Sequence, residues 1–338
     1  MSTTVIAPAD LETLIAAALC ACNTSEVNAR SVARALAQAE IDGQKGHGLS
    51  RVTSYGAQAK AGKVDGHAVP DVRQTRPGSL MVDCRHGFAF PAFDLVIERL
   101  PALAAANGIA AAGFTRSHHF GVAGRHVERL AEAGLVALAF GNTPQAMAPW
   151  GGKRPLFGTN PVAFAAPLPS QAPIVIDMAL SQVARGKILN AAQKGEAIPQ
   201  GWAVDEDGNA TTDAKAALQG ALQPIGGAKG AALAMMVEVL AVALTGSQFG
   251  FEASSFFDAE GPPPAVGQFL IAVDPGAFGG AEVFGARMAA LAGMIEGNGD
   301  ARLPGARRLA LRETAQREGV SVDSKLLAEV RALAGKDA

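Results

Sequence analysis

The sequence predicts an α+β protein in which a sheet-containing middle domain is inserted between N- and C-terminal helical segments that pack together. Helical patterns of apolar residues fill the first 63 residues and return within residues 300–338, whereas short apolar runs bounded by turn residues appear from residue 70. Strands that alternate with helices usually indicate a parallel Rossmann sheet. However, no G-x-G-x-x-G opens a helix after any of these strands. A dinucleotide would therefore need another binding arrangement.

The N-terminal segment is expected to form three helices. Asp10 can cap the first helix, because an aspartate side chain accepts hydrogen bonds from the first turn. The second helix starts on Thr24 or Ser25 and ends on Gly43, a residue type that favours the position after a helix. A third, short helix covers residues 49–62.

The middle of the chain alternates strand and helix patterns. Buried strands are expected at residues 81–84, 109–114, 135–141, 162–167, 173–179 and 268–275. Helices are expected at residues 89–107, 121–134, 231–246 and 281–296. Residues 195–227 are irregular and rich in glycine, with a strong turn signal in DEDGNAT. The predicted parts are the N-terminal helical part (1–75), the sheet domain (76–295) and the C-terminal helical part (296–338).

Composition limits the classes of function. Of the 338 residues 49% are hydrophobic and 18% charged, which is typical of a compact soluble enzyme and excludes general disorder. The net charge is −2 without any basic run, so no nucleic-acid partner is expected. No apolar segment reaches the ~20 residues of a membrane span, and no basic residue precedes Arg30 as in a secretory signal. With three cysteines in no paired arrangement, we expect a reduced, cytoplasmic protein.

The stretch IDGQKGHGLSR brings a histidine and an arginine together where a helical pattern stops. His47 has an ordinary pKa near ~6.5, so it can give or take a proton around neutral pH. Arg51 follows four residues later and falls in the first turn of the next helix. Its planar guanidinium suits a substrate carboxylate. The alternative is a surface histidine in a loop beside a solvated arginine.

Two adjacent histidines, His118 and His119, follow an apolar strand and precede a helix that Gly121 and Gly124 open. This arrangement is typical of an active-site rim, and the backbone N–H groups at such a helix start can also hold a phosphate. We expect no metal, because neither H-x-x-x-H spacing nor clustered carboxylates occur here. We interpret His126, inside the helix, as a solvated residue.

The segment PLFGTNPVAF places Gly158, Thr159 and Asn160 before a proline in an otherwise apolar passage. An ordinary turn is one interpretation. The other is a site where backbone amides and the threonine hydroxyl bind a carboxylate or a nicotinamide carboxamide. The pattern does not choose between them.

Two further segments are similar to helix entrances that receive phosphate. In IDMALSQVARGK an apolar strand ends in Asp177, Ser181 is a candidate helix cap, and Arg185 and Lys187 follow. In PIGGAKGAA three glycines and Lys229 precede an apolar helix. The alternatives are an ordinary cap and an ordinary loop, and neither segment has the spacing of a Walker A motif.

Nucleophilic catalysis is not expected. The chain has no G-x-S-x-G motif. Cys84 lies near His86 in sequence, but VDCRHG is typical of a strand end rather than of a thiol active site.

Taken together, these segments resemble the malate/L-lactate dehydrogenase-like family of nicotinamide oxidoreductases over almost the whole chain. The resemblance rests on six segments in the family's order: DGQKGHGLSR, SHHFGVAG, PLFGTNPVAF, IDMALSQVARGK, GGAKGAALAMMVEVLAVALTG and ARLPGARR. It implies a non-Rossmann NAD(P)-binding domain with a mixed sheet. It also implies a homodimer.

Within that family, PLFGTNP, SHHF and MMVEVLAVALTG look most like Δ1-piperideine-2-carboxylate/Δ1-pyrroline-2-carboxylate reductases. This likeness implies reduction of a small cyclic imino acid to L-pipecolate or L-proline with NADPH, or with NADH as the alternative. By the same likeness His47 is the proton donor, Arg51 binds the substrate carboxylate and Thr159 is a second substrate contact. His119 is the alternative acid/base. The resemblance assigns the cofactor to His119, Phe120, Gly121, Val122, Asp177, Met178, Ala179, Arg185, Lys229, Gly299, Arg302, Leu303, Pro304 and Gly305.

The chain departs from the imine reductases at three positions. They place a serine before the catalytic histidine and an aspartate in the VARGK segment, where this chain has Gly46 and Lys187, and a histidine often stands in place of Ala228. Lys187 is similar to the family's keto-acid dehydrogenases. The first alternative is therefore a dehydrogenase of a small 2-hydroxy acid, whose partner is a 2-keto acid. A non-catalytic sensor that binds NADPH or a carboxylate is the second alternative.

Overall fold

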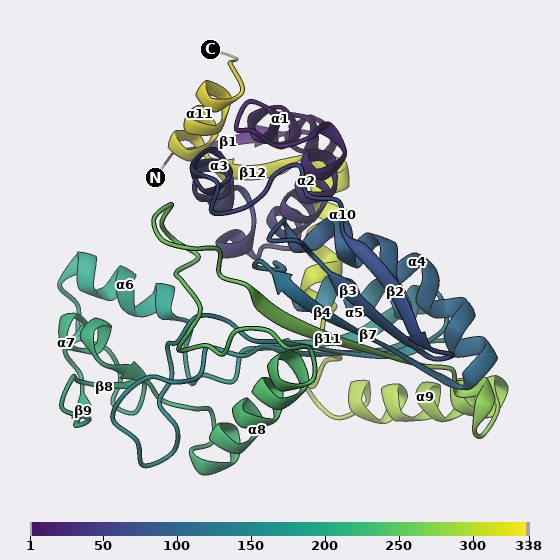
Figure 1. The fold of residues 1–338 in the computed structure, drawn as a ribbon. Coiled ribbons are helices and arrows are strands. Elements are labelled where there is room, and N and C mark those ends of the chain that lie inside the picture. The colour runs from purple at the N-terminus through teal and green to yellow at the C-terminus, as the bar shows by residue number, and fades with distance from the viewer. Residues whose placement is uncertain (1, 336–338) are drawn as a thin grey trace.

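The two ends of the chain form one helical unit in the computed structural model, which describes residues 2–335. Both ends lie at this unit in Figure 1. It contains α1 (Pro8–Cys20), α2 (Glu26–Ile41), α3 (Val52–Ala61), α11 (Ser324–Leu333) and the antiparallel pair of β1 (Thr3–Ile6) and β12 (Val320–Asp323). The prediction that the terminal segments pack together is confirmed. Residues 1 and 336–338, at the outer limits of the predicted helical parts, lie outside the described residues.

Apolar side chains from both ends of the chain share one core. Leu11 and Ile15 lie four residues apart on α1 and therefore on one face, which packs with Leu36 of α2. Val322 of β12 and Leu327 of α11 complete the cluster, and all five side chains are buried. Burial of such a side chain contributes about 1.5–3 kcal/mol. The N-terminal helices therefore depend on C-terminal residues for their stability.

A seven-stranded mixed sheet forms the middle of the molecule. Its spatial order is β2 (Asp71–Arg76), β3 (Ser79–Asp83), β4 (Ile109–Ser117), β11 (Val266–Val273), β5 (Val136–Gly141), β6 (Val162–Leu168) and β7 (Gln171–Met178). Only β3 and β4 pair in parallel, and every other neighbouring pair is antiparallel. The prediction of a mixed, non-Rossmann sheet is confirmed.

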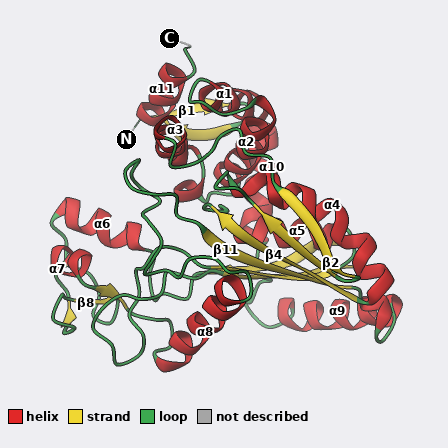
Figure 2. Cartoon of the chain, in the orientation of Figure 1, coloured by secondary structure: helices red, strands yellow, loops and turns green. Residues whose placement is uncertain are grey.

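Helices cover both faces of the sheet (Figure 2). Ala137 and Ala139 of β5 face α4 (Ala89–Asn107) and α5 (Ala123–Glu132), and their small side chains let these helices approach the sheet closely. Leu138 and Phe140, which alternate with the alanines, point to the other face and pack near α8 (Ala228–Glu238). On that second face lies α9 (Ala281–Glu296) as well.

The segment predicted to be irregular forms a small separate layer of structure. It contains α7 (Ala214–Gln219) and a three-stranded sheet of β10 (Ala221–Leu222), β8 (Ala203–Val204) and β9 (Ala210–Thr211), and α6 (Arg185–Lys194) directly precedes it. The predicted turn in DEDGNAT joins β8 to β9, because Asp205 accepts hydrogen bonds from the backbone of Asp207 and Asn209.

Several local predictions were wrong. Asp10 does not cap α1, since Ala7 is the N-cap and Pro8 begins the helix, where a missing N–H costs nothing. The helix predicted at 231–246 begins earlier, as α8, and passes into a π-helical turn at Val239–Ala243. The sequence patterns do not predict β1, β2 and β12. The domain boundaries remain a prediction.

A buried cluster of charges joins the helical unit to the sheet domain. Arg312 of α10 (Ala306–Glu318) donates hydrogen bonds of 2.6 and 2.8 Å to Asp42, and two of 2.8 Å to Glu128 of α5. Arg308 adds a 3.0 Å bond to Glu128. Burial opposes the charge on Glu128, but the two arginines hold its pKa below the ordinary value. Asp42 ends α2, so this cluster fixes where α2 stops relative to α5.

Replacing Arg312 with methionine should lower the free energy of unfolding by about 3 kcal/mol, because Asp42 and Glu128 then keep buried charges with too few partners. Urea unfolding measures this loss. Since the folded-state pKa of Glu128 is lowered, its contribution is present at neutral pH and fades below pH ~4.3, so the loss should shrink in acid.

The control variant is Arg317→Met on the same helix. Among the described residues Arg317 pairs only with Glu318 at the surface, with side chains 68% and 66% exposed, so its loss should change stability by less than about 0.5 kcal/mol. Equal losses in the two variants would contradict a structural role for the buried cluster.

Candidate active site

The loops after three strands meet at one edge of the large sheet. β4 and β5 run in the same direction, because both pair antiparallel with β11. β7 runs in this direction as well, because β6 lies between β5 and β7 and is antiparallel to both. A cavity of about 110 Å³ lies at this edge. The residues around it are Gln44, His47, His119, Phe120, Gly121, Val122, Ala123, Thr143, Thr159, Pro161, Asp177 and Ala179.

The loop with His47 reaches this edge from the helical unit. After α2 the chain makes two short 3-10 turns, Lys45–His47 and Leu49–Arg51. Leu49 is fully buried in the helical core, and its N–H donates a 2.9 Å hydrogen bond to the Glu40 carboxylate. A Cβ on Gly48 would lie 2.3 Å from that carboxylate and would displace it from this hydrogen bond. These contacts fix the backbone that presents His47.

His47 and His119 stack on each other in the cavity wall. Their ring centroids lie 5.2 Å apart and the planes differ by 6°. Burial and the nearby charge of Arg51 lower the pKa of His47 to about 4, and they lower the pKa of His119 well below its ordinary value. Both rings are therefore neutral near pH 7.

Arg51 is near enough to act on both histidines but is not among the residues that line the cavity. Its Nε donates a 2.8 Å hydrogen bond to the backbone oxygen of Gly46, and its guanidinium carbon lies 4.9 Å from the ring centroid of Phe257. Within residues 2–335 it forms no ion pair with a carboxylate. Its charge is therefore available to an anion, as the sequence predicts for a carboxylate ligand.

The segment of residues 256–260 packs against the histidines. Phe256 packs edge-on against His118 and His119, with both centroid distances 5.2 Å. Lys63 holds this segment, because its buried ammonium group donates to Asp258 Oδ1 at 2.8 Å and to the Glu260 backbone oxygen at 2.6 Å. The sequence patterns give no signal for this contact between segments some 190 residues apart.

Tyr55 is a further site residue that the sequence analysis missed. It lies on α3, is fully buried, and its hydroxyl lies 2.5 Å from His119 Nδ1. The available signal was its spacing, four residues after Arg51, which places both on one side of α3. Gln44 and Thr143 also line the cavity and were not predicted.

Thr159 sits where the turn before β6 meets the loop after β5. Its N–H donates a 2.9 Å hydrogen bond to the Thr143 hydroxyl. A Cβ on Gly158 would lie 2.1 Å from that hydroxyl, which explains the glycine. Asn160 donates a 2.9 Å hydrogen bond to Glu238 at the end of α8. The bend is therefore an ordered part of the cavity wall rather than an isolated turn.

Asp177 reaches across to the start of α5. Its carboxylate accepts a 2.8 Å hydrogen bond from the Gly124 N–H, and burial raises its pKa. The N–H group of Gly124, at a helix start that we predicted could hold a phosphate, is therefore already bonded to a carboxylate. Met178 is 44% exposed and, unlike Ala179, does not line the cavity.

The segments that precede two other helices pair with each other outside the cavity. The backbones of residues 180–182 and 223–225 are joined by hydrogen bonds, including Gln182 N–H to Gln223 at 2.7 Å. After this pairing the chain enters α6 at Arg185, and Lys229 lies in the first turn of α8. The predicted Ser181 cap was wrong, because its hydroxyl binds the Val183 oxygen and Ala184 precedes α6.

The loop from Gly299 to Gly305 lies beside β7 but does not line the cavity. It leads into α10, and Gly305 precedes that helix with a φ of +93°, a conformation that favours glycine. Leu303 packs against a small cluster that includes Ile174 of β7. Arg302 and Pro304, also predicted to hold the cofactor, belong to this loop. Its predicted role stays untested by these contacts.

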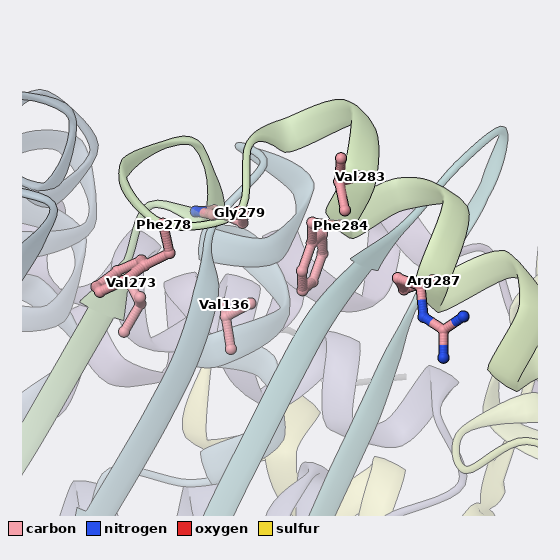
Figure 3. Close-up of a pocket in the computed structure, with 8 residues that line it drawn as sticks. Val136, Val273, Phe278, Gly279, Val283, Phe284 and Arg287 are labelled. Carbon is pink, nitrogen blue, oxygen red and sulfur yellow. The ribbon is translucent and has the colours of Figure 1, made fainter.

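Three other features concern alternatives to this site. The prediction that His126 is solvated was wrong, since it is buried and stacks on Phe93 at 4.0 Å. A larger apolar cavity of about 340 Å³ lies at the opposite edge of the sheet (Figure 3). It is lined by Val136, the first residue of β5, and by Phe284 of α9. It contains no predicted site residue. Within residues 2–335 no cluster of potential metal ligands occurs, and no helix has the length and apolarity to span a membrane.

Comparison with known proteins agrees with the fold and the motifs. A family model described as malate/L-lactate dehydrogenase matches residues 6–331. The (2R)-3-sulfolactate dehydrogenase (NADP(+)) of Chromohalobacter salexigens is 51% identical over 328 residues, 96% of each chain. The Δ1-pyrroline-2-carboxylate/Δ1-piperideine-2-carboxylate reductase of Pseudomonas putida is 43% identical over 331 residues, again 96% of each. The crystal structure of Δ1-piperideine-2-carboxylate reductase from Pseudomonas syringae pv. tomato has a TM-score of 0.93 at 38% identity, and the match covers 98% of this chain and 100% of that one.

Proposed function

Because the chain belongs to the malate/L-lactate dehydrogenase family, we propose that it reduces a small cyclic imino acid at C2, with NADPH as cofactor. The substrate is Δ1-piperideine-2-carboxylate or Δ1-pyrroline-2-carboxylate, and the product is L-pipecolate or L-proline. Relatives named as dehydrogenases and reductases make the chain an NAD(P)H-dependent oxidoreductase. The choice of the imine among small carboxylate substrates is the proposal.

One observation carries this choice: a guanidinium without a carboxylate partner lies beside two neutral histidines. Arg51 offers one positive charge, and a cyclic imino acid brings one carboxylate. The lowered pKa values of His47 and His119 leave no strong acid in the cavity at pH 7. A ketone needs such an acid where its oxygen gains charge, whereas an imine can enter already protonated. The electrostatics therefore support the imine.

The residues around the cavity fit the nicotinamide cofactor. Arg185 and Lys187 lie in the first turn of α6 and Lys229 in the first turn of α8, and cations at helix starts suit phosphates. Phe120 to Val122 and Thr159 line the cavity with apolar groups and backbone donors that suit the nicotinamide ring and its carboxamide. Bound NADPH supplies the hydride that C2 accepts.

In this proposal the protein residues bind, orient and exchange a proton. Arg51 holds the carboxylate, which places C2 beside the His47–His119 pair. His47 exchanges the proton of the ring nitrogen directly or through water. Phe256 covers the histidines and keeps water away from them.

A dehydrogenase of a small 2-hydroxy acid is the second candidate. The relative named (2R)-3-sulfolactate dehydrogenase is 51% identical to this chain. Gly46 also favours this candidate, because the resemblance to the imine reductases leads us to expect a serine there. Nothing lies within 4 Å of a Cβ built on Gly46, so packing does not require the glycine. Against it, 3-sulfolactate has two anionic groups, whereas this proposal assigns one cation, Arg51, to the substrate.

The substrate is tested by following NADPH oxidation with the two imines, pyruvate, oxaloacetate and 3-sulfopyruvate in parallel. We expect the largest kcat/KM for an imine. Turnover of the keto acids alone would overturn the imine proposal in favour of the second candidate. NADPH binding without turnover of any of the five would indicate the non-catalytic sensor.

Replacing Arg51 with methionine should raise the KM for the carboxylate substrate about 10- to 100-fold, since a charge-assisted hydrogen bond contributes about 1.5–3 kcal/mol. The kcat should change less. Steady-state kinetics measure both, and Arg317→Met serves as the control because Arg317 lies on the surface of α10. An unchanged KM in Arg51→Met would remove Arg51 from the site.

We also propose that the protein is a homodimer. Helix α8 and the following π-helical turn expose Met235, Met236 and Val239, which are 56%, 52% and 51% exposed. Neighbouring apolar side chains of this kind are typical of a subunit contact. Sedimentation equilibrium should give twice the chain mass, and Met236→Glu should shift the mass toward the monomer. A monomer at all concentrations would contradict the proposal.

A further inference from the structure

The hydroxyl of Tyr55 has one hydrogen-bond partner among the described residues, His119 Nδ1 at 2.5 Å. The tyrosine is fully buried. Aromatic rings surround it, with centroid distances of 5.4 Å to Phe88, 6.5 Å to Phe90 and 5.3 Å to His118. Both ring nitrogens of His118 are buried without partners, so that neighbour does not accept the phenolic hydrogen.

The direction of this hydrogen bond follows from its surroundings. If His119 donated from Nδ1, the phenolic hydrogen of Tyr55 would have no acceptor in a fully buried site, which costs about 1–3 kcal/mol. Burial also raises the pKa of Tyr55, so the phenol keeps its proton. Tyr55 is therefore the donor and Nδ1 the acceptor. A neutral imidazole that accepts at Nδ1 has its hydrogen on Nε2.

We propose that Tyr55 is a positioning residue that fixes His119 as the Nε2–H tautomer, so that His119 donates a hydrogen bond to a substrate oxygen while His47 alone exchanges the proton. This inference rests on the proposed function, because it assumes that a carboxylate substrate occupies the cavity. His119 lines that cavity, and Nε2 has no partner among the described residues.

The two histidines differ in their partners although their rings stack. His47 Nδ1 is buried without a hydrogen-bond partner, so no neighbouring side chain fixes its tautomer. No neighbouring group therefore locks the proton of His47 on one nitrogen, and the ring can act as an acid/base. His119 cannot take a proton at Nδ1 without stranding the Tyr55 hydrogen. This difference assigns separate roles to the pair that the sequence leaves interchangeable.

The direct test is the tautomer itself, observed by long-range ¹⁵N–¹H NMR on ¹⁵N-histidine-labelled protein without substrate. The chain has six histidines, and His119→Gln identifies the signals of His119. We expect a pyrrole-type Nε2 and a pyridine-type Nδ1 in the wild type, and a mixture in Tyr55→Phe. A hydrogen on Nδ1 of wild-type His119, or an unchanged tautomer in Tyr55→Phe, would overturn the proposal.

The kinetic test uses the fact that Tyr55 is the only tyrosine of the chain. Tyr55→Phe should lower kcat/KM for the carboxylate substrate about tenfold, the value of one hydrogen bond, with the KM for NADPH unchanged. Biosynthetic 3-fluorotyrosine labels this hydroxyl alone and keeps a donor, so it should retain the activity that phenylalanine loses. Equal kcat/KM in wild type and Tyr55→Phe would also overturn the proposal.

Phe88→Leu is the structural control, because Phe88 belongs to the same buried aromatic group but does not bind the hydroxyl. It should lower the melting temperature and leave the His119 tautomer signals unchanged. A tautomer change in Phe88→Leu as large as that in Tyr55→Phe would mean that packing, not the hydroxyl, sets the ring. Since the NMR experiment needs no substrate, failure of the proposed substrate would leave its result intact.

Discussion

The buried contact of Arg312 with Asp42 and Glu128 is the interaction on which the site depends. Asp42 ends α2 immediately before the loop that carries His47, and Glu128 belongs to α5, whose start lies at the cavity. One side of the cavity comes from the helical unit and the other from the sheet domain. A charged contact inside a nearly dry interface has strict geometry, because a small displacement leaves the ions without partners. It therefore holds His47 against His119.

Much of the fold follows from patterns within single segments. The helix at 89–107 and the strands around 109–114 and 162–167 carry strong apolar periodicity, and they form where predicted. The missed strands lack that signal. Four of the six residues of β2 are exposed, and β1 has two exposed positions in four. Such strands form because a partner from elsewhere in the chain supplies hydrogen bonds, which no local pattern records.

The site divides in the same way. His47, His119 and Thr159 were predictable because glycines, a doublet and a bend mark them in the sequence, and the fold brings them to one cavity. Tyr55 was not predictable, because a tyrosine in a helix is usually only a core residue. Its place in the site is recognised only once the fold shows that its hydroxyl lies next to His119. The segments that lead into the basic helix starts of Arg185 and Lys229 pair through their backbones, and neither residue lines the cavity. Burial of His126 depends on α4 and could not be read from its polar neighbours.

The pairing of β1 with β12 has a consequence for the order of assembly. Residues 3–6 find their strand partner only at residues 320–323, and the core of α1 needs Leu327. During synthesis the sheet domain emerges between these two parts and can acquire its own core. The helical unit cannot form until β12 and α11 have been translated. The loop with His47 belongs to this helical unit. A ribosome-bound chain thus completes the candidate active site only after β12 and α11 have been translated, and a product truncated before β12 cannot form it.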